Sequence, residues 1–133
     1  RRAAQWVGGG RIHTPHPRSY EQRMPKKMRQ AALRSALSVK AKEADVVVVD
    51  ELTISEPKTK LMSQALNKLV GDKSALVVLP QKDQSYEVAM RTIGNLEDAK
   101  VLLAGYLNIR DLFTYDKLVL PVTALDALAA NLG

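Results

Sequence analysis

Four short runs of aliphatic residues, separated by segments of helical pattern, constrain the fold of this chain more than any other feature. Each run is unbroken rather than alternating between apolar and polar residues, which is typical of strands buried on both faces of a sheet. Such strands occur in parallel sheets that helices cover. The sequence therefore predicts a small Rossmann-like α/β domain with a four-stranded, mainly parallel sheet flanked by helices, whose strand order one sequence does not determine. The expected strands are residues 46–49, 75–79, 100–104 and 118–120.

The segments around the strands carry helix-forming residues and recognisable boundaries. Pro25 suits a first helical turn, Gly71 occupies a helix-terminating position, and Ser85 and Asn108 can cap helices. The expected helices are residues 26–44, 57–70, 85–94, 108–113 and 122–132. The buried core is expected to include Val47, Val49, Val77, Leu79, Leu102 and Val119.

The first expected helix has a blurred apolar side. That side holds Met28, Ala32, Ala36 and Val39, with Leu33 and Leu37 next to it, while Arg29 and Lys40 intrude on it. A helix that contacts both a core and a charged partner has this pattern.

Charge is distributed unevenly along the chain. Residues 1–43 hold eleven Lys or Arg against two acids, whereas residues 44–133 hold nine against twelve, so a strongly basic head precedes a mildly acidic body. A basic head of this kind favours a polyanionic partner. Residues 1–24 have no helical or strand period and are rich in Gly and Pro. We therefore expect an extended basic arm over residues 1–24 and a globular α/β domain over residues 25–133.

The arm and the start of the first helix mix cations with planar rings. Arg and Lys suit phosphates, and aromatic and imidazole rings suit unpaired bases, so this mixture indicates RNA binding. A solvated charged face without a partner is the alternative. The candidate RNA-binding residues are Arg1, Arg2, Trp6, Arg11, His13, His16, Arg18, Tyr20, Arg23, Lys26, Lys27, Arg29 and Arg34.

Other kinds of site have weaker support. Gly8-Gly9-Gly10 lacks the preceding strand and following helix of a dinucleotide motif, so a close backbone approach or a tight bend is expected there. His13 and His16 lack the further ligands that zinc needs, and the chain has no cysteine. No metal, cofactor, small-molecule substrate or membrane span is expected, and the protein is not expected to be an enzyme. An α/β enzyme or nucleotide-binding domain stays the alternative, because Asp50 and Glu51 follow the first strand at the edge where such sites form.

Several motifs, taken in order, resemble the bacterial-type large-subunit ribosomal protein uL4 family over essentially the whole chain. They are Gly8-Gly9-Gly10, Pro15-His16-Pro17-Arg18-Ser19-Tyr20, Pro25-Lys26-Lys27-Met28, Ala32-Leu33-Arg34-Ser35-Ala36-Leu37-Ser38, Pro57-Lys58-Thr59-Lys60, Leu107-Asn108-Ile109-Arg110-Asp111-Leu112 and Asp116-Lys117-Leu118-Val119-Leu120. Each motif alone is weak, and their shared order and spacing carry the resemblance.

The resemblance implies a structural constituent of the large ribosomal subunit that binds large-subunit ribosomal RNA and supports subunit assembly. It implies an arm that runs toward the nascent-chain exit tunnel, neighbouring large-subunit ribosomal proteins as partners, and a place in cytoplasmic ribosomes, with organellar ribosomes left open. Some members also repress their own operon by binding its messenger leader. Family binding roles carry over to Arg11, Arg18, Tyr20, Lys26, Lys27 and Arg34.

The chain departs from the family pattern in two ways. His16 stands where the family has a lysine, so one permanent cation becomes titratable near neutral pH. The family's N-terminal strand and helix, and the outgoing limb and tip of its arm, are expected to precede residue 1. Residues 1–24 would then form only the returning limb.

Overall fold

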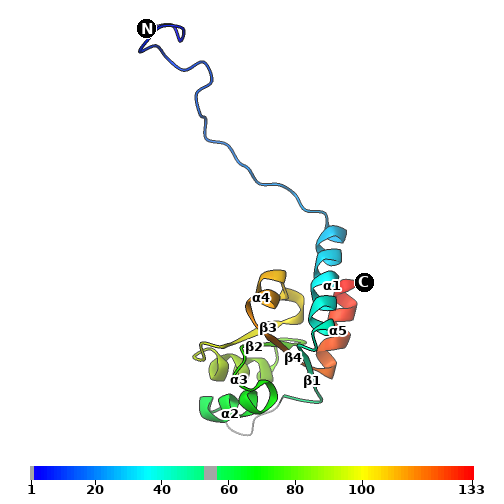
Figure 1. The fold of residues 1–133 in the computed structure, drawn as a ribbon. Coiled ribbons are helices and arrows are strands. Elements are labelled where there is room, and N and C mark those ends of the chain that lie inside the picture. The colour runs from blue at the N-terminus through cyan, green and yellow to red at the C-terminus, as the bar shows by residue number, and fades with distance from the viewer. Residues whose placement is uncertain (1, 53–56) are drawn as a thin grey trace.

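The computed structural model describes residues 2–52 and 57–133, in which four strands alternate with helices (Figure 1). In chain order the elements are α1 (Lys26–Lys42), β1 (Val46–Val49), α2 (Thr59–Val70), β2 (Ala75–Leu79), α3 (Gln84–Ile93), β3 (Ala99–Leu103), the short 3-10 helix η1 (Ala104–Tyr106), α4 (Ile109–Thr114), β4 (Lys117–Pro121) and α5 (Val122–Leu132).

The strands form one parallel sheet in the order β1-β4-β2-β3. Val77, on β2, is in register with Val119 on β4 and with Val101 on β3. The predicted α/β fold with a four-stranded parallel sheet is therefore confirmed. The strand order, which the sequence left undetermined, places the last strand between the first two.

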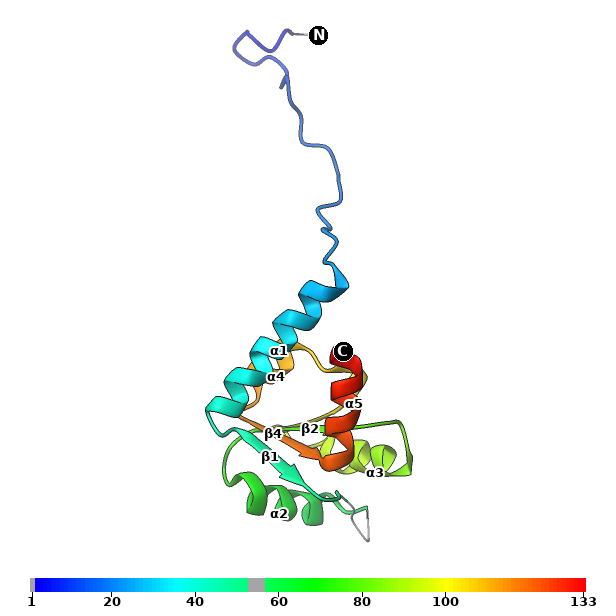
Figure 2. The same cartoon turned by 90° about the vertical axis from the view of Figure 1, so that its right-hand side faces the viewer.

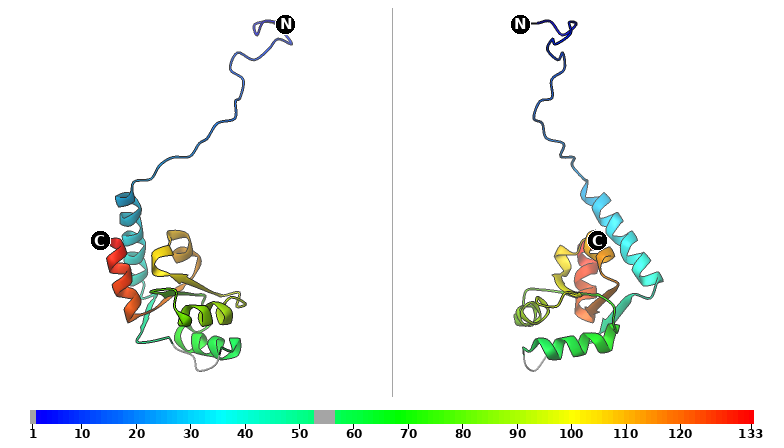
Figure 3. Two further views of the ribbon diagram at one scale, coloured as in Figure 1. Left: turned by 180° about the vertical axis from the view of Figure 1, so that it is seen from behind. Right: turned by 60° about the vertical axis from the view of Figure 1, so that its left-hand side comes forward.

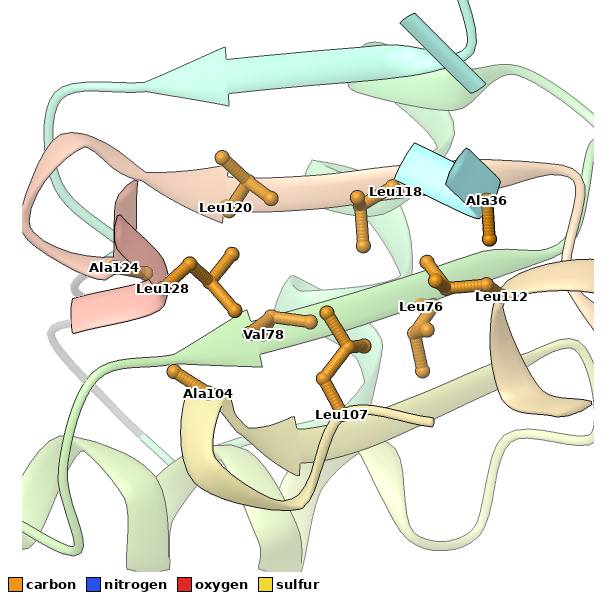
Figure 4. Close-up of a cluster of buried hydrophobic side chains, with 10 residues drawn as sticks. All are labelled: Ala36, Leu76, Val78, Ala104, Leu107, Leu112, Leu118, Leu120, Ala124 and Leu128. Carbon is orange, nitrogen blue, oxygen red and sulfur yellow. The ribbon is translucent and has the colours of Figure 1, made fainter. Parts of the chain in front are cut away.

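Helices cover both faces of the sheet (Figure 2). On one face, α1, α4, α5 and η1 enclose an upper cluster of side chains that includes Leu76, Val78, Leu118 and Leu120 (Figure 4). On the other face, α2 and α3 enclose a lower cluster that includes Val77 and Val119, together with Met62, Leu66 and Ile93 from the helices. Every side chain of β2 is buried because neighbouring residues point into opposite clusters, which explains its unbroken apolar run.

The predicted core is correct at the centre of the sheet and wrong at its edges. Val77, Leu79 and Val119 are buried as expected. Val47, Val49 and Leu102 are only partly buried, because β1 and β3 are the edge strands and each lacks one neighbouring strand.

The expected apolar side of α1 needs the same kind of correction. Met28 and Val39 are exposed, whereas the side chains that face the domain are Leu33, Ala36, Leu37 and Lys40. These four residues follow the helical spacing i, i+3, i+4 and i+7, so they form one stripe. The start of α1 projects beyond the body of the domain, which leaves Met28 in solvent (Figure 3).

Several helix boundaries also differ from the predicted ones by one or two residues, three of them as follows. α1 ends at Lys42 rather than Ala44, and Ala44 takes a positive φ of 55° that helical backbone does not have. α2 begins at Thr59, so Pro57 lies outside it. α3 begins at Gln84, with Asp83 rather than Ser85 in the N-cap position.

Candidate nucleic-acid interface

Residues 2–25 contain no helix or strand and lead away from the domain as an extended segment (Figure 1). Near its start the segment folds back on itself, with the Gly9 amide donating to the Trp6 carbonyl at 2.8 Å and the Trp6 amide to the Ala3 carbonyl at 3.2 Å. A Cβ on Gly9 would lie 2.0 Å from the Ala3 carbonyl oxygen, and Gly8 has a φ of +73°. Gly8 and Gly9 therefore permit a tight bend, one of the two roles expected of the three glycines.

The rings of this segment are open to solvent. Trp6 is 66% exposed and Tyr20 is 75% exposed. The Arg18 guanidinium stacks over the Tyr20 ring at 4.5 Å from its centroid, and His16 Nε2 lies 3.1 Å from Thr14 Oγ1. His13 is exposed as well. These contacts are local, so the rings stay accessible to a partner.

The cations form an exposed series from the arm into the first turns of α1. Arg2, Arg11, Arg18, Arg23, Lys26, Lys27 and Arg29 all lie in solvent, while Arg1 falls outside the described residues. The first turn of α1 holds two lysines and no acidic residue. Helix N-termini normally favour acidic residues because the backbone dipole is positive there. Two lysines at this end therefore destabilise the free helix slightly and favour the binding of an anion.

Arg34, the last predicted RNA-binding residue, makes contacts within the protein. Its guanidinium donates to the carbonyl oxygens of Leu132 and Gly133, where α5 ends. One turn earlier, Gln30 Nε2 donates to the Asn131 carbonyl at 2.9 Å. Both side chains satisfy carbonyls that a helix end leaves without intrahelical partners, so they also attach α1 to α5.

A polar network at the amino edge of the sheet holds the other end of α1. Lys40 is only 7% exposed, and its ammonium donates to the carbonyls of Tyr115 at 3.0 Å and Asp116 at 2.8 Å. Asp45 lies 3.9 Å from Lys40 and 2.8 Å from Lys117. The hydrogen bond from Lys117 holds the pKa of Asp45 below its ordinary value. In the sequence, Lys40 stood out only as a charged residue on the apolar side of the helix, and its partners were not predicted.

Two of the uL4-like motifs have structural roles in the domain. Asn108 caps α4 by accepting from the Asp111 amide at 2.8 Å, as predicted, and the Asp111 carboxylate accepts from Asn108 Nδ2 and from Lys100 Nζ, each at 2.8 Å. The Lys100 bond lowers the pKa of Asp111. In the second motif, Asp116 accepts from the Ser74 hydroxyl at 2.7 Å, which lowers its pKa and joins the starts of β2 and β4.

The carboxyl edge near Asp50 and Glu51 holds a surface pocket of about 380 Å³. Its described lining includes three acids, Asp50, Glu51 and Asp83, and no Lys or Arg. Among these described lining residues, a phosphate group would meet three carboxylates and no cationic side chain. Within residues 2–52 and 57–133, no group of three or more His, Cys, Asp or Glu is arranged to hold a metal ion. None of the helices in that part of the chain combines the length and apolar character needed to cross a bilayer.

Comparison with known proteins decides the family. The model of the ribosomal protein L4/L1 family matches residues 1–131. The chain belongs to this family. Among similar curated members, the large ribosomal subunit protein uL4 of Oceanobacillus iheyensis is 44% identical over 125 residues, which are 94% of this chain and 59% of the relative. The uL4 proteins of Pelotomaculum thermopropionicum (45% over 119 residues) and of a Thermoanaerobacter species (39% over 124 residues) cover 90% and 93% of the chain.

These comparisons confirm the uL4 resemblance that the motifs indicated. The chain spans only 56–59% of the length of these three L4/L1-family relatives.

Proposed function

We propose that the chain acts in the large ribosomal subunit as a structural, non-enzymatic protein. In this proposal residues 1–24 form an arm that binds large-subunit ribosomal RNA, and residues 25–133 form the globular domain that carries it. Membership of the L4/L1 family and the names of the relatives support this role.

The observation that carries the RNA-binding part is the state of the cations in the arm and at the start of α1. Five of these cations are exposed, and their side chains make no hydrogen bond or ion pair with the described residues of the protein. They are Arg2, Arg11, Arg23, Lys26 and Arg29. Cations on an extended segment can follow a phosphate backbone, and the exposed Trp6 and Tyr20 rings can stack on unpaired bases. None of residues 2–24 belongs to either hydrophobic cluster of the domain, so the stability of the domain does not explain why these cations lie on an extended segment.

The finer parts of the role follow from the same surface. An extended arm without bulky folded parts can enter crevices between RNA helices, which supports its course toward the nascent-chain exit tunnel and a role in assembling the subunit. Neighbouring large-subunit proteins would then contact the globular domain. The bacterial relatives support a place in cytoplasmic ribosomes. Repression of its own operon through a messenger leader would use the same affinity for RNA.

A salt titration of binding to large-subunit RNA fragments tests the proposal. Of the eleven Lys or Arg in residues 1–43, Arg34 and Lys40 are engaged within the protein. If about 5–8 of the others neutralise phosphates, the logarithm of the binding constant should fall against the logarithm of salt concentration with a slope of roughly −4 to −7. Replacing Arg18 and Arg23 with Ala should flatten this slope by about one to two units.

The control replaces two exposed cations of α2, Lys60 and Lys68, with Ala. It removes the same charge from the body and should leave the slope nearly unchanged. Equal slopes for the parent and the arm variant, or a larger flattening of the slope in the α2 variant, would show that the arm does not form the RNA-binding surface. Melting curves of all three proteins should coincide, because none of the four side chains is buried.

A further inference from the structure

A hollow at the β3 edge of the sheet combines exposed rings with cations. This β3-edge pocket has a volume of about 660 Å³ and lies between α3 and the end of β3. Its walls come from Lys82, Tyr86, Met90, Arg91, Leu103 and Tyr106, with Glu87 as the single acid among the described lining residues. β3 is the edge strand farthest from β1 in the sheet order, and α1 with the arm leads into β1. The pocket is therefore separate from the arm, which leaves the domain from the start of α1, away from α3 (Figure 1).

Two of the chain's few aromatic side chains form the walls. Tyr106 is 73% exposed, yet its backbone is fixed in η1, whose first residue, Ala104, is buried in the upper cluster. Tyr86 is half-buried on α3 and packs against the lower cluster, as does Leu103. Both rings are thus held by structured backbone while offering surface to the hollow. Exposed rings on a rigid support suit stacking against a flat ligand.

The two cations of the pocket lack protein partners. Among the described residues, neither Lys82 nor Arg91 makes a hydrogen bond or ion pair, and Glu87 forms no ion pair although it lies one helical turn from Arg91. Lys100 and Lys117, elsewhere on the body, are ion-paired at 2.8 Å. Residues 44–133 together are mildly acidic, so two unpaired cations beside two rings are a local exception to their charge.

We propose that the β3-edge pocket binds one unpaired nucleotide of an RNA strand. The base would stack on the Tyr106 and Tyr86 rings, and Lys82 and Arg91 would contact the phosphates on either side of it. An apolar protein segment would use the exposed surface of Met90 but leave the two cations without acceptors, whereas a nucleotide offers both a flat ring and phosphates, so it matches more of the pocket. The inference rests on the proposed RNA-binding function and adds to it a second contact on the globular domain, independent of the arm.

Amide chemical shifts of the ¹⁵N-labelled chain, titrated with a six-nucleotide uridine oligomer, test the pocket directly. Shifts are expected at residues 82–91 and 103–107, separately from any shifts in the arm. Tyr106→Ala should weaken binding at the pocket by about five-fold or more, because stacking on an aromatic side chain contributes to each bound base. Tyr106→Phe should retain the affinity. Phe113→Ala, which removes an exposed ring from α4, is the matched control and should leave the titration unchanged.

The outcomes separate this inference from the proposed function. Shifts confined to residues 2–34 would overturn the pocket and leave arm binding intact, whereas shifts in neither region would overturn both. Uridine monophosphate, added at the same concentration, should shift the pocket residues far less than the oligomer, because it lacks the second phosphate contact. Equal saturation by the mononucleotide would make this a site for free nucleotides and would overturn the assignment to RNA. If a Lys82→Ala/Arg91→Ala variant kept its affinity for the oligomer, the assignment to RNA would also be overturned.

Discussion

The buried ammonium of Lys40 gives the strongest single test of how α1 is held on the domain. Lys40→Met keeps most of the apolar stem and removes the charge that donates to the Tyr115 and Asp116 carbonyls. Each hydrogen bond from a charged group contributes about 1.5–3 kcal/mol. Part of this is offset, because a Met side chain avoids the desolvation of a charge and the carbonyl of exposed Asp116 can turn to water. We expect a net loss of about 2–4 kcal/mol, or a melting temperature lower by about 8–16 °C.

Thermal melting followed by circular dichroism measures this loss, with Lys42→Met as the control. Lys42 lies in the same helical turn but is exposed, so its replacement should leave the melting temperature nearly unchanged. The loss from Lys40→Met should persist in an Asp45→Asn background, because the carbonyls at 2.8 and 3.0 Å, rather than Asp45 at 3.9 Å, hold the ammonium. If Lys40→Met melts within about 2 °C of the parent, burial of this charge contributes no net stability and the reasoning is wrong.

Two further outcomes test the core and the acid response. Val77→Asp should abolish cooperative melting, because an unpaired carboxylate at a fully buried position costs several kcal/mol. The control Val48→Asp, at a half-exposed position of β1, should remain folded. A Val77→Asp protein that melts cooperatively would contradict the assignment of Val77 to the core. The pKa of Asp111 is lowered in the folded state, so its stabilising effect is present above the unfolded value of about 4 and is lost as the pH falls through the lower folded value. The stability difference between the parent and Asp111→Asn, measured by urea unfolding, should therefore be large at neutral pH and shrink in acid, and a constant difference would refute this role of Asp111.

The local sequence determined the elements of the fold because their causes lie within a few residues. The unbroken runs at 75–79 and 118–120 predicted strands buried on both faces, and both are found. Asn108 was predicted to cap a helix, and its side chain does so by accepting from the Asp111 amide. The family was also readable from the sequence, since its short motifs depend on residue identity and spacing alone.

Only the tertiary structure decided which polar residues serve the domain and which stay available to a partner. Arg34 and Lys40 resemble Lys27 and Arg29 in the sequence, yet the first two bind carbonyls from the far end of the chain while the last two lie in solvent. Those carbonyls lie 75 to 99 residues away, so no local pattern could reveal them. The β3-edge pocket depends in the same way on the strand order, because β3 must be an edge strand before the side chains of α3 and η1 can form a hollow beside it.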